Sequence, residues 1–269
     1  PMDTPLVSTA FLSDHLDDPH LVLVDASWYL PGSPRDPRAE YLASHLPGAV
    51  FFGIDDIADR NTTLPHMLPP PEAFASAVGA LGIGDTDTIV IYDEAGMSSA
   101  PRVWWTFSVM GARNVRLLDG GAPAWRAEGR PTEAGEVQRA PRTFRPQPQP
   151  GLVADFSAVL ATLGSGATTI IDARPANRFR GEAPEPRPGL RSGHIPGSLS
   201  VPATDLVDGT RLRPVAELRA VFDAAGVDLA RPIVTSCGSG VTAATLLLAL
   251  KLAGARDVAV YDGSWAEWS

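Results

Sequence analysis

Residues 232–245 read PIVTSCGSGVTAAT and contain Cys237, the single cysteine of the chain. The β-branched run 233–235 predicts a short buried strand, and the strong helix formers of 243–253 predict a helix. Between them lies the loop 237–242, whose two glycines let the backbone curl and point successive N–H groups at one place. The helix N-terminus adds unpaired N–H groups and the positive end of its dipole. We therefore expect an anion cradle that keeps Cys237 as a thiolate near neutral pH.

The alternative is a buried, inert cysteine, which is the common fate of a free thiol. The position of Cys237 between a strand and a helix favours the nucleophile.

The chain also contains an internal repeat. Four landmarks recur in the same order, displaced by 143 to 149 positions, and the displacement pairs Cys237 with Asp93. The paired segments are 21–30 with 168–179, 44–50 with 193–199, 88–100 with 232–244, and 111–125 with 254–268. This agreement indicates a tandem duplication. His45 and His194 lie in the second pair, one in each half, so we expect them to stabilise turns rather than to share a metal ion.

In each half, β-branched runs alternate with helical patterns, which predicts an α/β fold with a mostly parallel sheet flanked by helices on both faces. We expect a first domain over residues 1–132, a proline-rich linker over 133–152, and a second domain over 153–269. Ligands of such sheets bind beyond the carboxyl ends of the strands, which is where the Cys237 loop lies.

The composition excludes several classes of protein. The 269 residues carry a formal net charge of −9, which argues against nucleic acid or an anionic membrane as a partner. One cysteine excludes a disulfide within the chain and any metal site built from several cysteines. The chain has no apolar run of about 18 to 20 residues. Residues 1–20 lack a basic segment followed by an apolar one, so we expect no signal peptide and a cytoplasmic location.

The loop CGSGVT at 237–242 resembles the active-site loop of the rhodanese superfamily, in particular of its 3-mercaptopyruvate sulfurtransferases. The resemblance covers nearly the whole chain and implies two tandem rhodanese-like domains. It implies transfer of sulfane sulfur from 3-mercaptopyruvate, through a persulfide on Cys237, to a thiol, cyanide or thioredoxin-like acceptor, with release of pyruvate and without a cofactor. Asp93 cannot carry a sulfane sulfur, so we expect it to cap the following helix in a catalytically silent first domain.

The same resemblance implies the residues of the site. Arg178 and Arg187 match the arginines that hold the substrate carboxylate, a task for which the forked guanidinium donors are suited. The loop residues expected to contribute to substrate binding are Gly238, Gly240, Val241 and Thr242.

A further segment, 51–69, matches the part of the family that supplies an acidic residue and a histidine. By this match Asp55 and His66 form a relay with Ser239. The alternative for His66 is that it satisfies buried backbone carbonyls.

Three other functions remain open. A thiosulfate sulfurtransferase typically has basic residues after the cysteine, where this chain has Gly238 and Ser239. A cysteine-dependent phosphatase of this fold ends its loop in an arginine, where this chain has Ala243 and Ala244. A silent binding module tends to lose the cysteine, which only the first half of this chain lacks.

Overall fold

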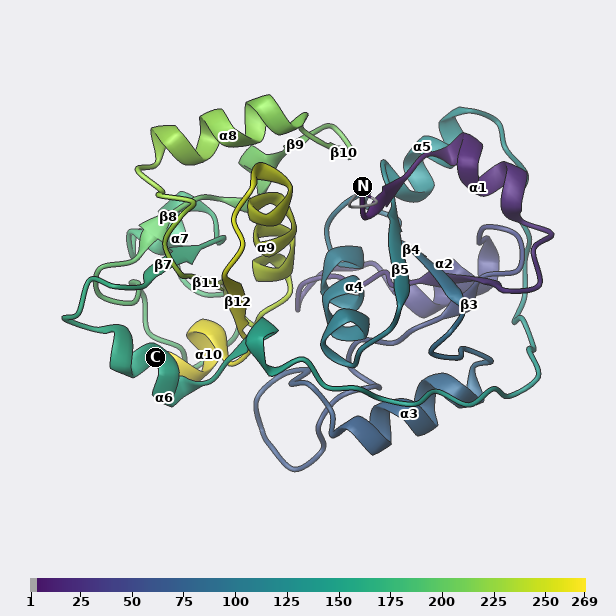
Figure 1. The fold of residues 1–269 in the computed structure, drawn as a ribbon, viewed down its shortest axis with the longest axis horizontal. Coiled ribbons are helices and arrows are strands. Elements are labelled where there is room, and N and C mark those ends of the chain that lie inside the picture. The colour runs from purple at the N-terminus through teal and green to yellow at the C-terminus, as the bar shows by residue number, and fades with distance from the viewer. Residues whose placement is uncertain (1–3) are drawn as a thin grey trace. The chain divides into compact units, whose positions relative to one another are not determined.

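The computed structural model describes residues 4–269, so residues 1–3 of the expected first domain lie outside the described part (Figure 1). The chain divides into two compact units. Of the described residues, the first comprises 4–61, 68–149 and 209–211, and the second comprises 62–67, 150–208 and 212–269. Each half of the repeat therefore builds most of one unit, and residues 62–67 of the first half belong to the second unit.

In the first unit, strands β1 to β5 form a parallel sheet in the order β1-β5-β4-β2-β3. The strands are β1 (Leu6–Val7), β2 (Leu21–Asp25), β3 (Val50–Phe51), β4 (Thr88–Tyr92) and β5 (Asn114–Leu118). The helices are α1 (Thr9–His15), α2 (Pro37–Ala43), α3 (Pro71–Ala80), α4 (Ala100–Val109) and α5 (Gly121–Ala127).

In the second unit, the parallel sheet has the order β6-β12-β11-β7-β8. Its strands are β6 (Val153–Ala154), β7 (Thr169–Asp172), β8 (Leu199–Ser200), β11 (Ile233–Ser236) and β12 (Val258–Tyr261). The helices are α6 (Phe156–Thr162), α7 (Ala176–Phe179), α8 (Val215–Ala224), α9 (Thr242–Ala253) and α10 (Ser264–Trp268). Short 3₁₀ helices span Pro150–Leu152 (η1) and Ala203–Leu206 (η2), and β9 (Val207–Asp208) and β10 (Arg211–Leu212) follow η2 as a two-stranded pair.

The two sheets have the same strand order, because β4, β2 and β5 of the first correspond to β11, β7 and β12 of the second. In both, the strand before the Asp93 or Cys237 loop lies at the centre of the sheet. The predicted pair of α/β domains with parallel sheets is therefore confirmed.

Both faces of the first sheet are covered by other elements, which explains why its strands are apolar along their length. Leu21 and Leu23 of β2 pack in a buried cluster with Leu12 of α1 and Trp125 of α5. Val22 points to the opposite face, since successive side chains of a strand alternate, and it is fully buried as well. In the second unit, α9 packs on β11, β12 and α8 (Figure 1). Nine of its 12 residues are buried.

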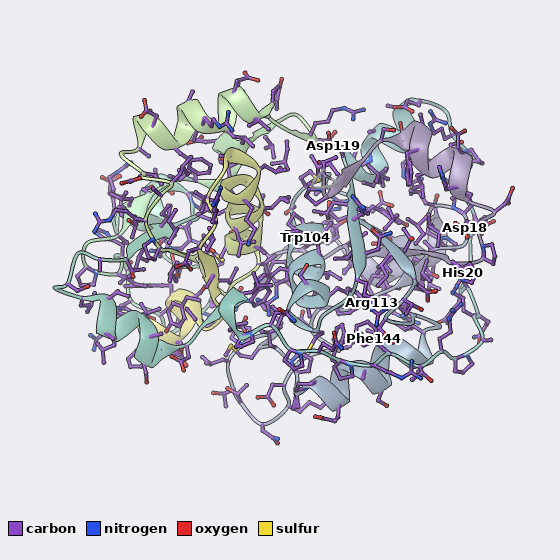
Figure 2. All side chains as sticks on the ribbon, in the orientation of Figure 1. Asp18, His20, Trp104, Arg113, Asp119 and Phe144 are labelled. Atoms are coloured by element: carbon purple, nitrogen blue, oxygen red, sulfur yellow. The ribbon has the colours of Figure 1, made fainter. Side chains whose placement is uncertain are left out.

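The stretch from residue 133 to residue 149, most of the expected linker, packs along the first unit. Phe144, labelled in Figure 2, is 4% exposed. The centre of its ring lies 5.3 Å from that of Phe74 and 6.0 Å from that of Phe107. The backbone N–H of Arg142 donates to Gly79, and that of Gln147 donates to Met110. The domain limits predicted from the sequence stay predictions.

No helix within residues 4–269 is long and apolar enough to cross a membrane.

Candidate active site

Cys237 follows β11 directly, and α9 begins five residues later at Thr242. Its side chain is 2% exposed, and the backbone N–H of Gly240 donates a hydrogen bond to Sγ over 3.0 Å. Gly240 has φ +90°, a left-handed conformation that glycine adopts at little cost. Val241 is buried and Thr242 is partly exposed at the start of α9. The predicted strand, loop and helix around Cys237 are confirmed.

The matching loop of the first unit holds a carboxylate in the same place. Asp93 is 1% exposed, and its Oδ1 accepts the N–H groups of Ala95 at 2.9 Å and Gly96 at 2.6 Å. Its Oδ2 accepts three more, from Ser98 at 3.0 Å, Ser99 at 2.9 Å and Ala100 at 2.7 Å. Because Ala100 is the first residue of α4, Asp93 caps that helix as expected, and the loop around it is an occupied anion cradle.

The displacement of 144 positions between Asp93 and Cys237 identifies the equivalent donors of the second loop. They are the N–H groups of Ser239, Gly240, Thr242, Ala243 and Ala244. Gly96 and Gly240 occupy the same position in the two loops, and both have positive φ, +121° and +90°. The two backbones therefore bend in the same sense, which can direct N–H groups towards the side chain at the head of the loop.

Arg178 lies in α7 and approaches the cysteine loop. Its Nε and Nη2 donate to the carboxylate of Glu185 at 2.8 and 2.9 Å. Its Nη2 also lies 2.8 Å from the point where a Cβ on Gly238 would be, so the missing side chain at Gly238 leaves room for the guanidinium group. Arg187 lies later in the segment that follows α7 and is partly buried.

Sequence reasoning missed the ion-pair network beneath Arg178. Arg174 is 1% exposed and pairs with Asp172 at 2.8 Å and with Glu185 at 3.3 Å. Its guanidinium group also lies 4.9 Å from the centre of the Trp265 ring. Burial alone would raise the pKa of Glu185, but the ion pairs with Arg178 and Arg174 hold that pKa below its usual range. The signal was present in the sequence, because an arginine two residues after a buried strand-end aspartate is placed to pair with it.

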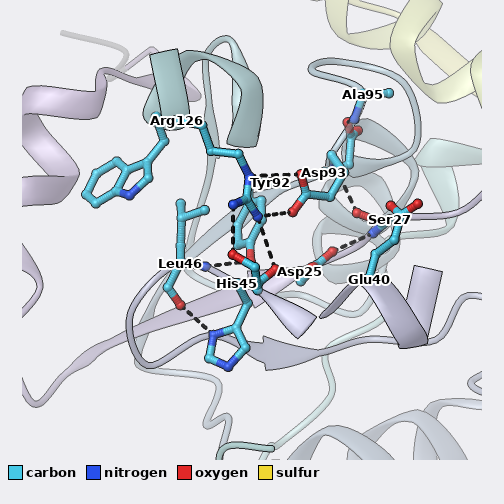
Figure 3. A network of polar contacts seen from close by, with 12 residues as sticks. Asp25, Ser27, Glu40, His45, Leu46, Tyr92, Asp93, Ala95 and Arg126 are labelled. Carbon is cyan, nitrogen blue, oxygen red and sulfur yellow. Dashed lines mark hydrogen bonds and ion pairs between the residues drawn. The ribbon is translucent and has the colours of Figure 1, made fainter. Parts of the chain in front are cut away.

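At the equivalent strand end of the first unit, Ser27 stands instead of Arg174. Asp25 is fully buried, its Oδ1 accepts the N–H of Ser27 at 2.9 Å, and within residues 4–269 its Oδ2 has no hydrogen-bond partner (Figure 3). Burial raises the pKa of Asp25 from its ordinary 3.8 to about 7, although the bonds from Ser27 oppose the rise. Nearby, Arg126 and Glu94 form an ion pair, with 2.7 Å between Nη2 and Oε1.

His66 and Ser239, both in the second unit, are brought together. Each is 5% exposed, and Nε2 of His66 lies 2.9 Å from Oγ and 3.0 Å from the carbonyl oxygen of Ser239. A carbonyl oxygen only accepts, so the 3.0 Å bond requires the hydrogen on Nε2. His66 has φ +35°, a left-handed conformation that is strained for a residue with a side chain. Asp55 is exposed in the first unit and accepts a 2.9 Å hydrogen bond from the Trp28 indole.

Two further histidines, His45 and His194, contact backbone carbonyls. His45 is fully buried, with its ring nitrogens 2.8 Å from the carbonyl oxygen of Leu46 and 2.7 Å from that of Gly135. His194 is exposed, stacks on Phe179 and lies 2.7 Å from the carbonyl oxygen of that residue. These contacts fit the expected role in stabilising turns.

The fold and this loop define a class of protein. Residues 8–128 and 155–269 each match the family described as rhodanese-like domain. The chain therefore belongs to the rhodanese family, as two tandem copies of its domain.

Its relatives identify the branch of that family. The 3-mercaptopyruvate sulfurtransferase of Escherichia coli strain K12 is 44% identical over 98% of this chain and 95% of its own length. The human protein of the same name is also 44% identical, over 98% of this chain and 91% of its own. The crystal structure of SseA from Escherichia coli covers 98% of this chain and 99% of its own, with a TM-score of 0.91 and 42% identity. An Arabidopsis thaliana relative, 44% identical over 98% of this chain and 76% of its own, is named thiosulfate/3-mercaptopyruvate sulfurtransferase 1, mitochondrial.

Proposed function

We propose that this protein is a sulfurtransferase that moves sulfane sulfur from 3-mercaptopyruvate, through a persulfide on Cys237, to a thiol or cyanide acceptor and releases pyruvate. The thiolate of Cys237 attacks the thiol sulfur of the donor and forms an S–S bond. The C–S bond breaks, its electron pair stays on carbon as the pyruvate enolate, and a proton then converts the enolate to pyruvate. In the second step the acceptor attacks the terminal sulfur, and the thiolate of Cys237 leaves.

The observation that carries this proposal is the occupied cradle around Asp93. A persulfide extends one heavy atom beyond Sγ, just as an aspartate carboxylate extends one heavy atom beyond Cγ. A terminal sulfur on Cys237 would therefore reach about as far into its loop as the Asp93 oxygens reach into theirs. Those oxygens accept five backbone N–H groups, and the equivalent donors in the second loop would stabilise the negative charge of the outer sulfur.

The arginines fit the organic part of the donor. We propose that Arg178 and Arg187 bind its carboxylate, with Gly238, Gly240, Val241 and Thr242 forming the loop side of the site. Arg178 is held beside Gly238 by Glu185, so its guanidinium group can reach a ligand of Cys237 without a large rearrangement.

Ser239 is proposed to deliver a proton to the enolate, with His66 and Asp55 as its relay. The 2.9 Å contact between His66 and the Ser239 hydroxyl supports the first link. For His66 to accept the hydroxyl proton, its Nε2 must lose the hydrogen that it donates to the Ser239 carbonyl, so the relay requires the other tautomer.

Thiosulfate is the second candidate donor, because the Arabidopsis relative carries both substrates in its name. The loop of this chain offers Gly238 and Ser239 where such enzymes place basic residues, which favours the keto acid. The acceptor is proposed to be a small thiol, cyanide or a thioredoxin-like protein, and the location to be cytoplasmic.

A comparison of wild type with Cys237→Ser tests the function. Wild type should form pyruvate from 3-mercaptopyruvate faster than it consumes thiosulfate, and mass spectrometry should find one added sulfur on the peptide that contains Cys237. The variant should fold normally and lose more than 99% of its turnover, since a hydroxyl is a far weaker nucleophile at neutral pH. A variant that keeps a tenth of the turnover would exclude Cys237 as the sulfur carrier.

A further inference from the structure

Ser264, the first residue of α10, has a strained backbone. Its φ is +53°, and apart from His66 it is the one non-glycine residue of the described chain with positive φ. Its side chain is fully buried, and Oγ accepts the backbone N–H of Cys237 at 3.2 Å while it donates to the carbonyl oxygen of Tyr261 at 2.9 Å. A left-handed conformation is unfavourable for serine, and such strain persists where the surrounding structure enforces it.

The first unit shows what this position looks like without the hydroxyl. The repeat places Gly121 opposite Ser264, and Gly121 has nearly the same φ, +57°. The next residue makes the same bond in both units, because Ala122 N–H donates to the Asp93 carbonyl and Trp265 N–H donates to the Cys237 carbonyl, each at 3.0 Å. Both turns therefore hold the carbonyl of the residue at the head of the loop. In the second unit Ser264 also accepts its N–H.

The residue before Ser264 has another backbone conformation than its counterpart in the first unit. A Cβ on Gly121 would lie 2.6 Å from the Asp93 carbonyl oxygen, so the first unit cannot accept a side chain there without a shift. Gly120, just before it, has φ +84°, whereas the matching Gly263 has φ −63°. The turn of the second unit differs at this residue and accommodates a serine next to the cysteine.

We propose that Ser264 is a positioning residue for Cys237, an inference that rests on the proposed role of Cys237 as nucleophile. Its hydroxyl and the Trp265 N–H hold the two backbone polar groups of Cys237, which fixes the direction of the Cα–Cβ bond. That direction keeps Sγ at 3.0 Å from the Gly240 N–H. Glycine suffices in the first unit, because five N–H groups already orient the Asp93 carboxylate.

Two substitutions separate the effect of the Ser264 hydroxyl on the position of Cys237 from its effect on the stability of the protein. Ser264→Gly and Ser264→Ala both remove the hydroxyl, but only glycine relieves the strain at positive φ. Ser236→Ala is the matched control, because Ser236 precedes Cys237, is 1% exposed, and in the described part of the chain its Oγ has no hydrogen-bond partner. The measurements are thermal unfolding, the rate of Cys237 alkylation by iodoacetamide, and the single-turnover rate of persulfide formation from 3-mercaptopyruvate.

Both Ser264 variants should form the persulfide about three- to tenfold more slowly, the equivalent of one hydrogen bond. Alkylation of Cys237 should slow by a similar factor in both, and Ser236→Ala should match wild type. If Ser264→Ala fails to fold, the strain-free glycine variant decides alone. Rates of alkylation and of persulfide formation within twofold of wild type in Ser264→Gly would overturn the proposal, and so would losses of rate that follow the loss of thermal stability. Turnover that survives in Cys237→Ser would instead overturn the proposed function.

Discussion

Asp93 places a carboxylate in the loop that follows β4, and Cys237 places a sulfur in the loop that follows β11. The strand orders of the two sheets match, and the glycine three residues on has positive φ in both loops. In the first unit the N–H groups stabilise a permanent negative charge and cap α4. In the second, the Gly240 N–H donates to Sγ of Cys237, and we propose that the loop stabilises the outer sulfur of a persulfide. The two loops therefore share their backbone bend and differ in the side chain at the head of the loop.

The two units also differ in the buried charges at the ends of β2 and β7. Asp25 is buried and accepts the Ser27 N–H, while the matching Asp172 is ion-paired with the buried Arg174. Arg174 also contacts Glu185, which in turn holds Arg178 against the cysteine loop. The second unit thus uses buried charge to orient the partly buried Arg178, whereas the first unit buries the Asp25 carboxyl with a hydrogen bond from Ser27.

The largest effect is expected for Asp93→Cys, which gives the first unit the residue of the second. Removal of the carboxylate leaves five N–H groups without their acceptor, and each buried donor left unpaired costs about 1 to 3 kcal/mol. Since these losses are not fully additive, we expect destabilisation by about 5 kcal/mol, measured by urea unfolding.

No second active site should appear in that variant, because Ser27 stands where the second unit has Arg174. Asp93→Asn, which keeps the shape and one acceptor oxygen, is the control and should lose less stability. Two sulfane sulfurs per chain after donor treatment of Asp93→Cys would contradict this account of the two halves.

Asp25→Asn should stabilise the protein at alkaline pH. The pKa of Asp25 is about 7 in the folded chain and near its ordinary 3.8 when unfolded, so the folded state holds the proton more tightly. Stability then falls as pH rises from about 4 to about 7, and the full difference corresponds to about 4 kcal/mol. Asparagine cannot ionise, so the variant should resemble wild type near pH 4 and exceed it in urea unfolding at pH 8.

The matched substitution in the second unit, Asp172→Asn, should act in the opposite direction. It removes one of the two carboxylates that Arg174 contacts, and breaking a buried ion pair typically costs about 3 to 5 kcal/mol. Equal responses of the two variants at pH 8 would show that the two strand ends are electrostatically alike.

Arg178→Ala and Arg187→Ala should each lower kcat/KM for 3-mercaptopyruvate by about ten- to a hundredfold. A hydrogen bond to a charged group contributes about 1.5 to 3 kcal/mol, and about 1.4 kcal/mol corresponds to a factor of ten. Arg180→Ala is the control, because Arg180 lies two residues from Arg178 but is 55% exposed and pairs with the exposed Glu182. Iodoacetamide should alkylate Cys237 at the wild-type rate in all three variants. If that rate falls in parallel with turnover, the arginines act on the thiolate rather than on the carboxylate.

Much of this arrangement could be predicted from the sequence, because the repeat and the cysteine loop are local patterns. The strand before Cys237, the helix after it and the capping by Asp93 depend on residues close together in the chain. The contact between Arg174 and Glu185 depends instead on how the segment after β7 folds back. The positive φ of Ser264 could not be predicted either, because serine, unlike glycine, does not indicate a left-handed conformation. Periodicity finds elements, but buried charge pairs and backbone strain appear only in the folded chain.

The smallest effect is expected for Ser239→Ala. This variant tests whether the hydroxyl that the second loop has and the first loop lacks serves proton transfer or the shape of the loop. The matching residue of the first loop is Ala95, whose N–H still donates to Asp93, so the loop forms without a hydroxyl at this place. In the variant, the Ser239 carbonyl remains available to His66 as an acceptor at 3.0 Å, which should keep the loop in place. Pyruvate formation should then slow by about three- to tenfold, because the enolate must take its proton from water. Delivery of sulfur from a preformed persulfide contains no enolate and should be unchanged. Single-turnover measurements of the two half-reactions separate these steps, and equal slowing of both would mean that Ser239 shapes the loop and carries no proton.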